Sequence, residues 1–240
     1  MDSLYLVMPA YNEEENIRDV VDQWYPILAA GGPDSRLVVA DSGSTDHTHA
    51  ILQDLQQTHP QLEILSDTGK YHGPKVIALY RHAVNRQADY IFQTDSDGQT
   101  SPAEFSAFWQ MRREYDGIFG YRRVRGDGLV RAFVEKVVCL LLQMYFGVRV
   151  PDANAPFRLM KTTAVQKYLD RFDADYNLPN IMMTTFFVYY HEKYLFREIS
   201  FSPRRKGKNS INIKKIIVIG LQALKDFAGF KKQLKRDREK

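Results

Sequence analysis

The first two-thirds of the chain alternate between short apolar runs and segments with helical periodicity. Such short, nearly continuous apolar runs are typical of strands that are buried on both faces. They are LYLVM at residues 4–8, RLVVA at 36–40, LEIL at 62–65, YIFQT at 90–94 and GIFGY at 117–121. The alternation predicts a doubly wound α/β fold, in which helices flank a mostly parallel sheet and ligands bind beyond the carboxyl ends of the strands.

Two segments between these runs carry apolar residues at helical spacing. They are Ile17, Val20, Val21, Trp24, Ile27 and Leu28, and then Val76, Leu79, Tyr80, Ala83 and Val84. Spacings of three and four residues place such side chains on one face of a helix. Asn12 and Glu15 stand where an N-cap residue and its partner three residues later would open the first helix. We therefore expect this helix to begin directly after Asn12.

A chain of this length can form one α/β domain or two, and we expect one compact domain with a C-terminal appendage. The chain has 240 residues, of which 44% are hydrophobic, and this is enough for a sizeable core. Cys139 is the only cysteine, so no internal disulfide can form and a reducing compartment is expected. The stretch MDSLYLVMPAYNEE lacks the basic and apolar regions of a secretory signal. No apolar stretch reaches the roughly 18 residues that a membrane span needs.

Acidic loops follow three of the predicted strands. Their sequences are PAYNEEEN at residues 9–16, DSGSTDHT at 41–48 and DSDGQTSP at 95–102. A single acidic residue at a helix start is ordinary, and Asp46 or Glu15 could serve in that way alone. Three such loops at one edge of a sheet would repel each other unless a cation lay among them. A divalent metal with its ligand is the simplest candidate.

Asp95 and Asp97 are the leading metal ligands in these loops. At a strand end, the alternation of side chains points both carboxylates to one side and Ser96 to the other. Gln99 is a candidate for a third oxygen ligand. Mg²⁺ or Mn²⁺ held by few protein oxygens usually completes its coordination with water and phosphates, so the predicted ligand is a nucleotide diphosphate. The pair alone is a weak signal, and its weight comes from the strand before it and the two acidic loops upstream.

Other phosphate and metal motifs are incomplete in this chain. Residues 69–75 are like a P-loop, but their glycines are too close together and no Ser or Thr follows Lys75. Residues 126–128 lack the third glycine of a dinucleotide-binding fingerprint and do not follow the first strand. His47 and His49 have no partner motif for zinc.

The acidic motifs, in this order, resemble the successive signatures of the family 2 glycosyltransferases, which have the GT-A fold. They are PAYNE at residues 9–13, DSGSTD at 41–46 and DSDGQ at 95–99. The resemblance continues through residues 120–122 and 157–159 to the region of residues 204–210. Within the family, the chain looks most similar to the dolichol- and polyprenyl-phosphate mannosyltransferase branch.

The resemblance implies a role for each matching residue of the donor site. Pro9, Tyr11, Glu13 and Asp41 would hold the base and ribose, and Lys75, Asp95, Arg158 and Arg205 complete the nucleotide-sugar site. Arg158 and Arg205 are expected to face phosphate oxygens, for which a guanidinium group is well suited. Asp95, Asp97 and Gln99 would hold Mg²⁺ or Mn²⁺, with Asp97 also counted as catalytic. The family's reaction is an inverting displacement in which the metal and cations stabilise the departing diphosphate.

The acceptor side departs from the branch. Arg122 and Arg131 are the candidate acceptor-binding residues, but Glu135 stands where a serine often follows and Pro156 stands where a glycine is usual. An anion at position 135 would repel a lipid phosphate. A phosphate acceptor needs only orientation, whereas a hydroxyl acceptor needs a general base. Asp152 is the candidate for that catalytic base, and the alternative is a plain turn residue.

The C-terminal part of the chain is basic. From Arg204 onward there are 13 Lys and Arg against 3 Asp and Glu, whereas the first 203 residues have 20 against 26. We expect a glycosyltransferase domain at residues 1–210 and a basic amphipathic helix at 211–240. That helix would lie on an anionic membrane, or would dock on the domain or on a second subunit. Residues 129–148 form another apolar helix, too short to span a bilayer, which is either a core or an interfacial helix.

The resulting hypothesis is a metal-dependent inverting glycosyltransferase at the cytoplasmic face of a membrane. It would move one sugar from a nucleotide-diphosphate sugar to a lipid-linked acceptor such as polyprenyl phosphate. A hydroxyl acceptor and a nucleotide-sugar-binding membrane module without turnover are the alternatives, and a homo-oligomer stays open. A nucleotidyltransferase is disfavoured because the loop PAYNEEEN is not glycine-rich. Nucleic acid is disfavoured as a binding partner because the body of the chain is acidic. Ser42, where the family usually has a second Asp, leaves the nucleobase open.

Overall fold

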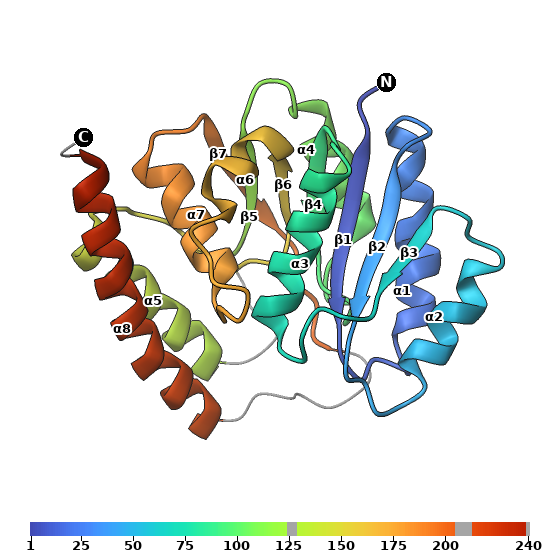
Figure 1. Cartoon of the computed structure of the whole chain (residues 1–240), viewed down its shortest axis with the longest axis horizontal. Coiled ribbons are helices and arrows are strands. Elements are labelled where there is room, and N and C mark those ends of the chain that lie inside the picture. The colour runs from blue at the N-terminus through green and yellow to red at the C-terminus, as the bar shows by residue number, and fades with distance from the viewer. Residues whose placement is uncertain (124–128, 205–212, 239–240) are drawn as a thin grey trace.

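The computed structural model describes residues 1–123, 129–204 and 213–238 (Figure 1). Side chains are described for residues 1–123, 132–204 and 220–237. Arg205 therefore lies outside the described residues, and so does the side chain of Arg131.

The described residues form one seven-stranded sheet in the order β3-β2-β1-β4-β6-β5-β7. The strands are β1 (Leu4–Ala10), β2 (Arg36–Asp41), β3 (Leu62–Leu65), β4 (Tyr90–Gln93), β5 (Gly117–Arg122), β6 (Arg158–Lys161) and β7 (Tyr194–Ile199). All neighbouring pairs are parallel except those that β6 makes with β4 and with β5. The predicted doubly wound, mostly parallel sheet is confirmed. The chain leaves β1 toward β2 on one side and reaches β4 on the other, which is the switch point where such sheets bind ligands.

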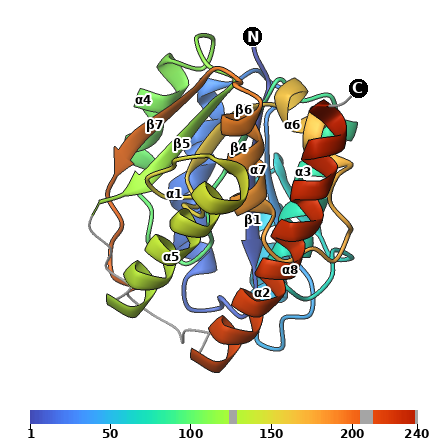
Figure 2. The ribbon, with the colours of Figure 1, turned by 90° about the vertical axis from the view of Figure 1, so that its left-hand side faces the viewer.

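Helices cover both faces of the sheet (Figures 1 and 2). The α-helices are α1 (Ile17–Trp24), α2 (Thr48–Gln56), α3 (His72–Asn85), α4 (Phe105–Gln110), α5 (Leu129–Phe146), α6 (Thr162–Leu169), α7 (Pro179–Tyr189) and α8 (Ile213–Arg238). Two short 3₁₀ helices, Tyr25–Ala30 and Pro102–Glu104, follow α1 and precede α4. Buried residues of α1, α2 and α4 form one hydrophobic core on one face, and those of α3, α5, α6, α7 and α8 form the other.

The first helix begins later than the sequence predicts. Asn16, not Asn12, is the residue before its first turn, and Asn12 has a φ of 54°. Asn12 instead accepts a hydrogen bond of 2.8 Å from the amide of Thr45 through its side-chain oxygen, and its own amide donates to the Ser44 hydroxyl. The prediction of Asn12 as a helix cap is therefore wrong, because this side chain joins the loops after β1 and β2.

Helix α8 packs against the domain beside α5, as Figures 1 and 2 both show. Phe227 is buried, with its ring 5.7 Å from that of Phe146 and 6.0 Å from that of Tyr145 in α5. Phe230 lies 5.6 Å from Phe186 of α7, so the second half of α8 shares the core of the sheet. Within the described part of the chain, no helix combines the length and hydropathy needed to cross a bilayer.

Candidate active site

Hydrogen bonds hold the three acidic loops together at the carboxyl edge of the sheet. The Ser96 hydroxyl of the loop after β4 donates to the Pro9 carbonyl of β1 at 2.8 Å. The amide of Glu13 donates to the Thr48 hydroxyl at 2.8 Å, which joins the loop after β1 to the start of α2. The sheet thus brings into one cluster the residues that the acidic loops contribute.

Asp95 and Asp97 lie in a tight turn at the end of β4. Gly98 has a φ of 72°, a left-handed conformation that glycine adopts without strain, and the amide of Gln99 then reaches Asp97 Oδ1 at 3.1 Å. Ser96 between them is buried and directed to Pro9. Burial raises the pKa of Asp97 to about 7, and the neighbouring Asp95 carboxylate adds to this shift. An additional cation beside the two carboxylates would therefore stabilise their charged forms.

Glu13 is buried beside this pair and forms an ion pair with Arg204. The two Glu13 oxygens both lie 2.6 Å from Arg204 Nη2, and Asn16 donates to one of them at 2.8 Å. Burial raises the pKa of Glu13, although Asn16 and Arg204 oppose the shift. The segment that carries Arg204 is fixed by Gln99, whose side-chain amide donates to the Ser202 carbonyl at 2.7 Å.

Arg204 is a candidate site residue that the sequence reasoning missed. The sequence reasoning selected Arg205 from the pair Arg204-Arg205, and Arg205 lies outside the described residues. The signal was present in the run of two arginines. Strand β7, which directs this segment toward the carboxyl edge, was not predicted, so the sequence could not show which arginine reaches the cluster.

Lys75 and Tyr11 contact each other at the end of β1. The Lys75 ammonium is buried, donates to the Ala10 carbonyl and lies 5.2 Å from the centre of the Tyr11 ring. Burial lowers the pKa of Lys75 to about 8, while Asp41 opposes the shift. The Lys70 ammonium lies 5.6 Å from the same ring, so Tyr11 is next to two cations. Asp41 is buried at the end of β2, accepts a hydrogen bond from Ser44 and lies 3.1 Å from His49 Nδ1.

Arg122 and Asp152 are bonded to each other. The guanidinium donates to the two carboxylate oxygens at 2.7 and 3.0 Å, and both side chains are nearly inaccessible to solvent. Asp152 also accepts the Asn154 amide at 3.1 Å, and the guanidinium lies 4.9 Å from the centre of the Phe201 ring. The candidate acceptor cation and the candidate base therefore neutralise each other in this structure.

Arg158 does not face the cluster as expected. Its side chain is 1% exposed in the core and donates to the carbonyls of Ala155 and Asn180 at 2.8 and 3.0 Å. The expectation that Arg158 faces phosphate oxygens is corrected, because its guanidinium hydrogen bonds backbone carbonyls instead. Glu135, on the inner face of α5, accepts the Ala153 amide at 2.8 Å.

The carboxylate set fits a divalent metal that takes part of its coordination from a ligand. The described residues contain no group of three or more His, Cys, Asp or Glu that could hold a metal ion. Asp95 and Asp97 supply two hard oxygens, which suits Mg²⁺ or Mn²⁺ with phosphate and water in the other positions. Burial, and then the charge of Asp95, raise the pKa of Asp97, and a bound cation would oppose both effects.

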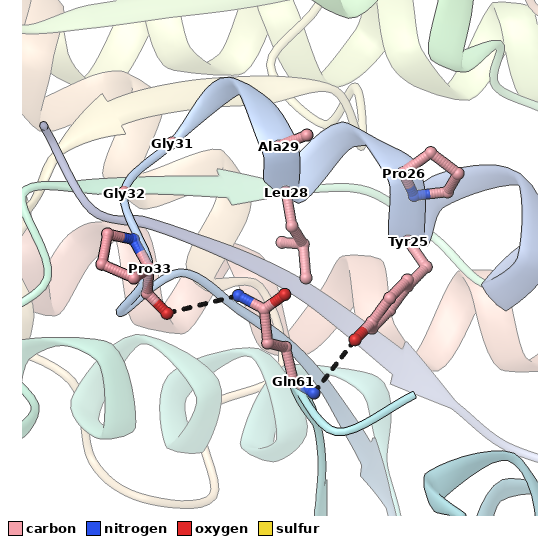
Figure 3. Close-up of a pocket in the computed structure, with 8 residues that line it drawn as sticks. All are labelled: Tyr25, Pro26, Leu28, Ala29, Gly31, Gly32, Pro33 and Gln61. Carbon is pink, nitrogen blue, oxygen red and sulfur yellow. Dashed lines mark hydrogen bonds between the residues drawn. The ribbon is translucent and has the colours of Figure 1, made fainter. Parts of the chain in front are cut away.

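A cavity elsewhere in the molecule does not compete with this cluster. It has a volume of about 260 Å³ and lies at the amino ends of β2 and β3 (Figure 3). Its lining residues are Tyr25, Pro26, Leu28, Ala29, Gly31, Gly32, Pro33 and Gln61. The Gln61 amide donates to the Tyr25 hydroxyl at 3.1 Å, and its side chain donates to the Pro33 carbonyl at 3.3 Å. These polar groups already form hydrogen bonds with each other, so they are not available to bind a ligand in the cavity.

Comparison with known proteins identifies the family. The model of the family described as "Glycosyl transferase family 2" matches residues 5–169. The chain belongs to this family. The resemblance seen in the three acidic motifs is thereby confirmed.

Two curated relatives of this chain are named as polyprenyl-phosphate enzymes. One is an undecaprenyl-phosphate 4-deoxy-4-formamido-L-arabinose transferase of Shewanella sediminis, 25% identical over 71% of this chain and 51% of that protein. The other is an undecaprenyl-phosphate mannosyltransferase of Micrococcus luteus, 25% identical over 67% of each chain. The chain thus spans about half the length of some of the curated relatives it matches.

A solved structure shares the fold. It is glucosyl-3-phosphoglycerate synthase from Mycobacterium tuberculosis in complex with Mn²⁺, UDP and glucosyl-3-phosphoglycerate. The TM-score is 0.61 at 17% identity, and the match covers 86% of this chain and 73% of the other. This likeness confirms the GT-A fold of the chain.

Proposed function

We propose that this chain is a metal-dependent inverting glycosyltransferase that moves one sugar from a nucleotide-diphosphate sugar to a polyprenyl phosphate. The observation that carries the proposal is the cluster of Asp95, Asp97 and Glu13 at the switch point of the sheet, with Arg204 against it. Such a cluster suits a ligand that combines a divalent cation with phosphate groups.

The metal would be held by Asp95 and Asp97, with Gln99 buried beside them. When bound, Mg²⁺ or Mn²⁺ would neutralise charge that develops on the departing diphosphate. The structural relative that carries Mn²⁺ and UDP supports a divalent metal in this fold.

The chain's own groups would bind and orient the donor. Tyr11 offers a ring face for the base, and Asp41 and Pro9 are at the strand ends where the base and ribose would lie. Lys75 would supply positive charge from the nucleotide side. Arg204 would release Glu13 and turn to the diphosphate oxygens, because a guanidinium group can move between carboxylate and phosphate partners of similar geometry. Arg205, outside the described residues, stays a candidate for the same task.

The names of the relatives support polyprenyl phosphate as the acceptor, whereas the contact between Arg122 and Asp152 argues against a phosphate acceptor. Both named relatives are called undecaprenyl-phosphate transferases. Arg122 is neutralised by Asp152, however, and this pair favours a hydroxyl acceptor as the second candidate. In that case Asp152 would have to leave Arg122 before it could accept a proton. Arg131 would bind the acceptor in either case.

The enzyme would work as a peripheral protein at the cytoplasmic face of a membrane that carries the lipid acceptor. The basic helix α8 supports this placement, since exposed cations are attracted to anionic lipid. Its buried side chains show that the same helix also docks on the domain.

The donor site is tested by thermal shift with UDP, GDP, CDP and dTDP, each with Mn²⁺, with Mg²⁺ and with EDTA. A ligand of the folded state raises the melting temperature as its concentration exceeds the dissociation constant. We expect one base to give a metal-dependent shift that Asp97→Asn abolishes. Asp54→Asn is the matched control, because Asp54 is an exposed carboxylate on α2. An equal shift in Asp97→Asn would refute the metal assignment.

The acceptor is tested by transfer of radiolabelled sugar from the donor that this panel identifies. Undecaprenyl phosphate and undecaprenol, in matched detergent, separate a phosphate acceptor from a hydroxyl acceptor. Product with the phosphate alone supports the proposal. Product with the alcohol alone would replace it with the hydroxyl-acceptor alternative.

A further inference from the structure

The outward face of α5 is a continuous apolar ridge. Phe133, Val137, Leu140 and Met144 are 67%, 38%, 57% and 66% exposed. Their spacings of four, three and four residues place them in one row along the helix. We call these four side chains the α5 ridge. Single exposed apolar residues are normal in proteins, whereas a contiguous row of large ones marks an interaction surface.

The ridge is not a misplaced part of the core. The opposite face of α5 already packs inward, through Leu142 and Phe146, which are 0% and 7% exposed. The row extends over about 16 Å, at roughly 1.5 Å per helical residue. Helix α5 therefore has two apolar faces, of which the domain covers one.

The ridge begins at the same edge of the molecule as the candidate active site. Helix α5 follows β5, whose carboxyl end lies at the edge where the acidic loops gather. Helix α8 begins nine residues along the chain after Arg204, which contacts Glu13 in the cluster. Figures 1 and 2 show both helices starting at this edge and running side by side away from it.

Exposed cations lie along α8, and one of them lies against α5. Lys225, Lys231, Lys232, Lys235 and Arg236 are exposed, against two acidic residues between positions 220 and 237. One of those two, Asp237, pairs with Arg171 of the domain at 2.7 Å. The Lys231 ammonium lies 5.7 Å from the centre of the Tyr145 ring of α5, so the positive charge is directly beside that helix.

We propose that the α5 ridge inserts into the interface of an anionic lipid bilayer, with the cations of α8 at the headgroups. A row of large apolar side chains beside a row of cations has the chemistry of an interfacial helix, since the apolar groups enter the acyl boundary and the cations bind anionic headgroups. This differs from anchoring by the basic C-terminal helix alone, because α5 supplies the apolar contact and α8 supplies the charge.

A second copy of the chain fits this surface less well. A stable dimer buries roughly 800 Å² on each partner. The ridge is a single row on one helix, on the order of 300–600 Å² at most by comparison with typical surface patches. The flanking lysines of two copies would also face each other across a two-fold interface, and like charges repel.

The consequence for catalysis rests on the proposed function, whereas the docking itself does not. With the ridge in the bilayer, the edge that carries Asp95 and Asp97 would lie at the end of the membrane-contacting face from which α5 starts, next to the headgroup layer. A lipid-linked phosphate would then reach the site without leaving the headgroup layer. The lipid surface is thus a partner of the site as well as an anchor.

The test is flotation of the full chain with vesicles of phosphatidylcholine alone and of phosphatidylcholine mixed with phosphatidylglycerol. We expect binding to the mixed vesicles, reduced at least tenfold by Leu140→Ser combined with Met144→Ser. Gln143→Ser is the control on the same helix, because Gln143 is exposed outside the ridge; the helix propensity that it loses is about half that of the double variant. Lys225→Glu combined with Lys232→Glu should abolish the preference for the mixed vesicles.

A second measurement keeps the test informative if the ridge variant folds poorly. In Phe133→Trp, the new indole should shift its fluorescence to shorter wavelength when mixed vesicles are added. The native Trp24 and Trp109 are 1% and 8% exposed, so they contribute a constant background. No shift, no flotation of the wild-type chain, or equal flotation of the ridge variant would overturn the proposal.

Two further measurements distinguish lipid docking from a dimer interface and from the donor site. Sedimentation without lipid that shows a dimer, converted to monomers by the ridge variant, would assign the ridge to a second copy and refute lipid docking. The nucleotide thermal shift, measured without vesicles, reports on the donor site alone. A ridge variant that keeps this shift and loses flotation supports the docking surface independently of the donor site.

Discussion

Replacing Asp152 by alanine would leave the Arg122 guanidinium buried without its carboxylate partner. The two side chains are 2% and 5% exposed, and two hydrogen bonds of 2.7 and 3.0 Å join them. Asp152 also accepts the amide of Asn154, which would lose this acceptor. The cost of the change therefore comes mainly from an uncompensated buried charge.

The magnitude follows from this geometry. Removing one partner of a buried ion pair costs about 3–5 kcal/mol. That is a large part of the roughly 5–15 kcal/mol by which domains are stable. For a chain of this size, each kcal/mol lowers the melting temperature by about 2–4 °C, so the expected fall is roughly 6–20 °C.

The assay is thermal unfolding followed by circular dichroism, with urea unfolding for the free energy. The exposed pair of Arg18 and Asp54 supplies the control, since Asp54→Ala should cost no more than about 1 kcal/mol. Arg122→Met combined with Asp152→Leu should recover most of the loss, because it removes both charges. Asp152→Ala melting within about 2 °C of wild type would refute the reasoning and favour a free, catalytic Asp152.

Two other changes test the nucleotide side of the site and the docking of α8. Burial lowers the pKa of Lys75 from its usual value of 10.5 to about 8, so between these two pH values the unfolded chain binds more protons than the folded chain, and Lys75 makes stability rise with pH. Lys75→Met should flatten this rise in a series of thermal melts. An unchanged slope of stability against pH in the variant would contradict the assignment. Phe227→Ala should lower the free energy of unfolding, measured in urea, by about 3–5 kcal/mol, because this ring of α8 is 0% exposed where it packs against α5. Leu221→Ala, at the exposed face of the same helix, should change the stability little. A Phe227→Ala variant as stable as wild type would mean that residues 211–240 are a separate appendage.

The sequence predicted the five strands whose residues are apolar on both faces. It missed β6 and β7 for physical reasons. Strand β6 has four residues, two of which are Arg158 and Lys161, and β7 is an edge strand with half-exposed side chains. Neither has the continuous apolar pattern of a buried parallel strand. The position of Arg158 in the core could not be deduced without β6.

The acidic cluster was predictable because parallel strands place their carboxyl ends at one edge. The ion pairs that Glu13 and Asp152 form could not be predicted. Arg204 and Glu13 are 191 residues apart, and Arg122 and Asp152 are separated by α5. Such pairs depend on the path of the whole chain, and residue types alone do not show which charges will meet.

The position of β6 in the sheet also constrains how the protein folds. This strand comes after β5 in the chain but lies between β4 and β5, so β5 and β7 cannot join the sheet until β6 has paired with β4. During synthesis, the order β3-β2-β1-β4 can form first, with β4 as a temporary edge of unpaired backbone groups. Such an edge invites pairing with another nascent chain, and high contact order prolongs its exposure. The segment around β6 is therefore where we expect misassembly of this fold to begin.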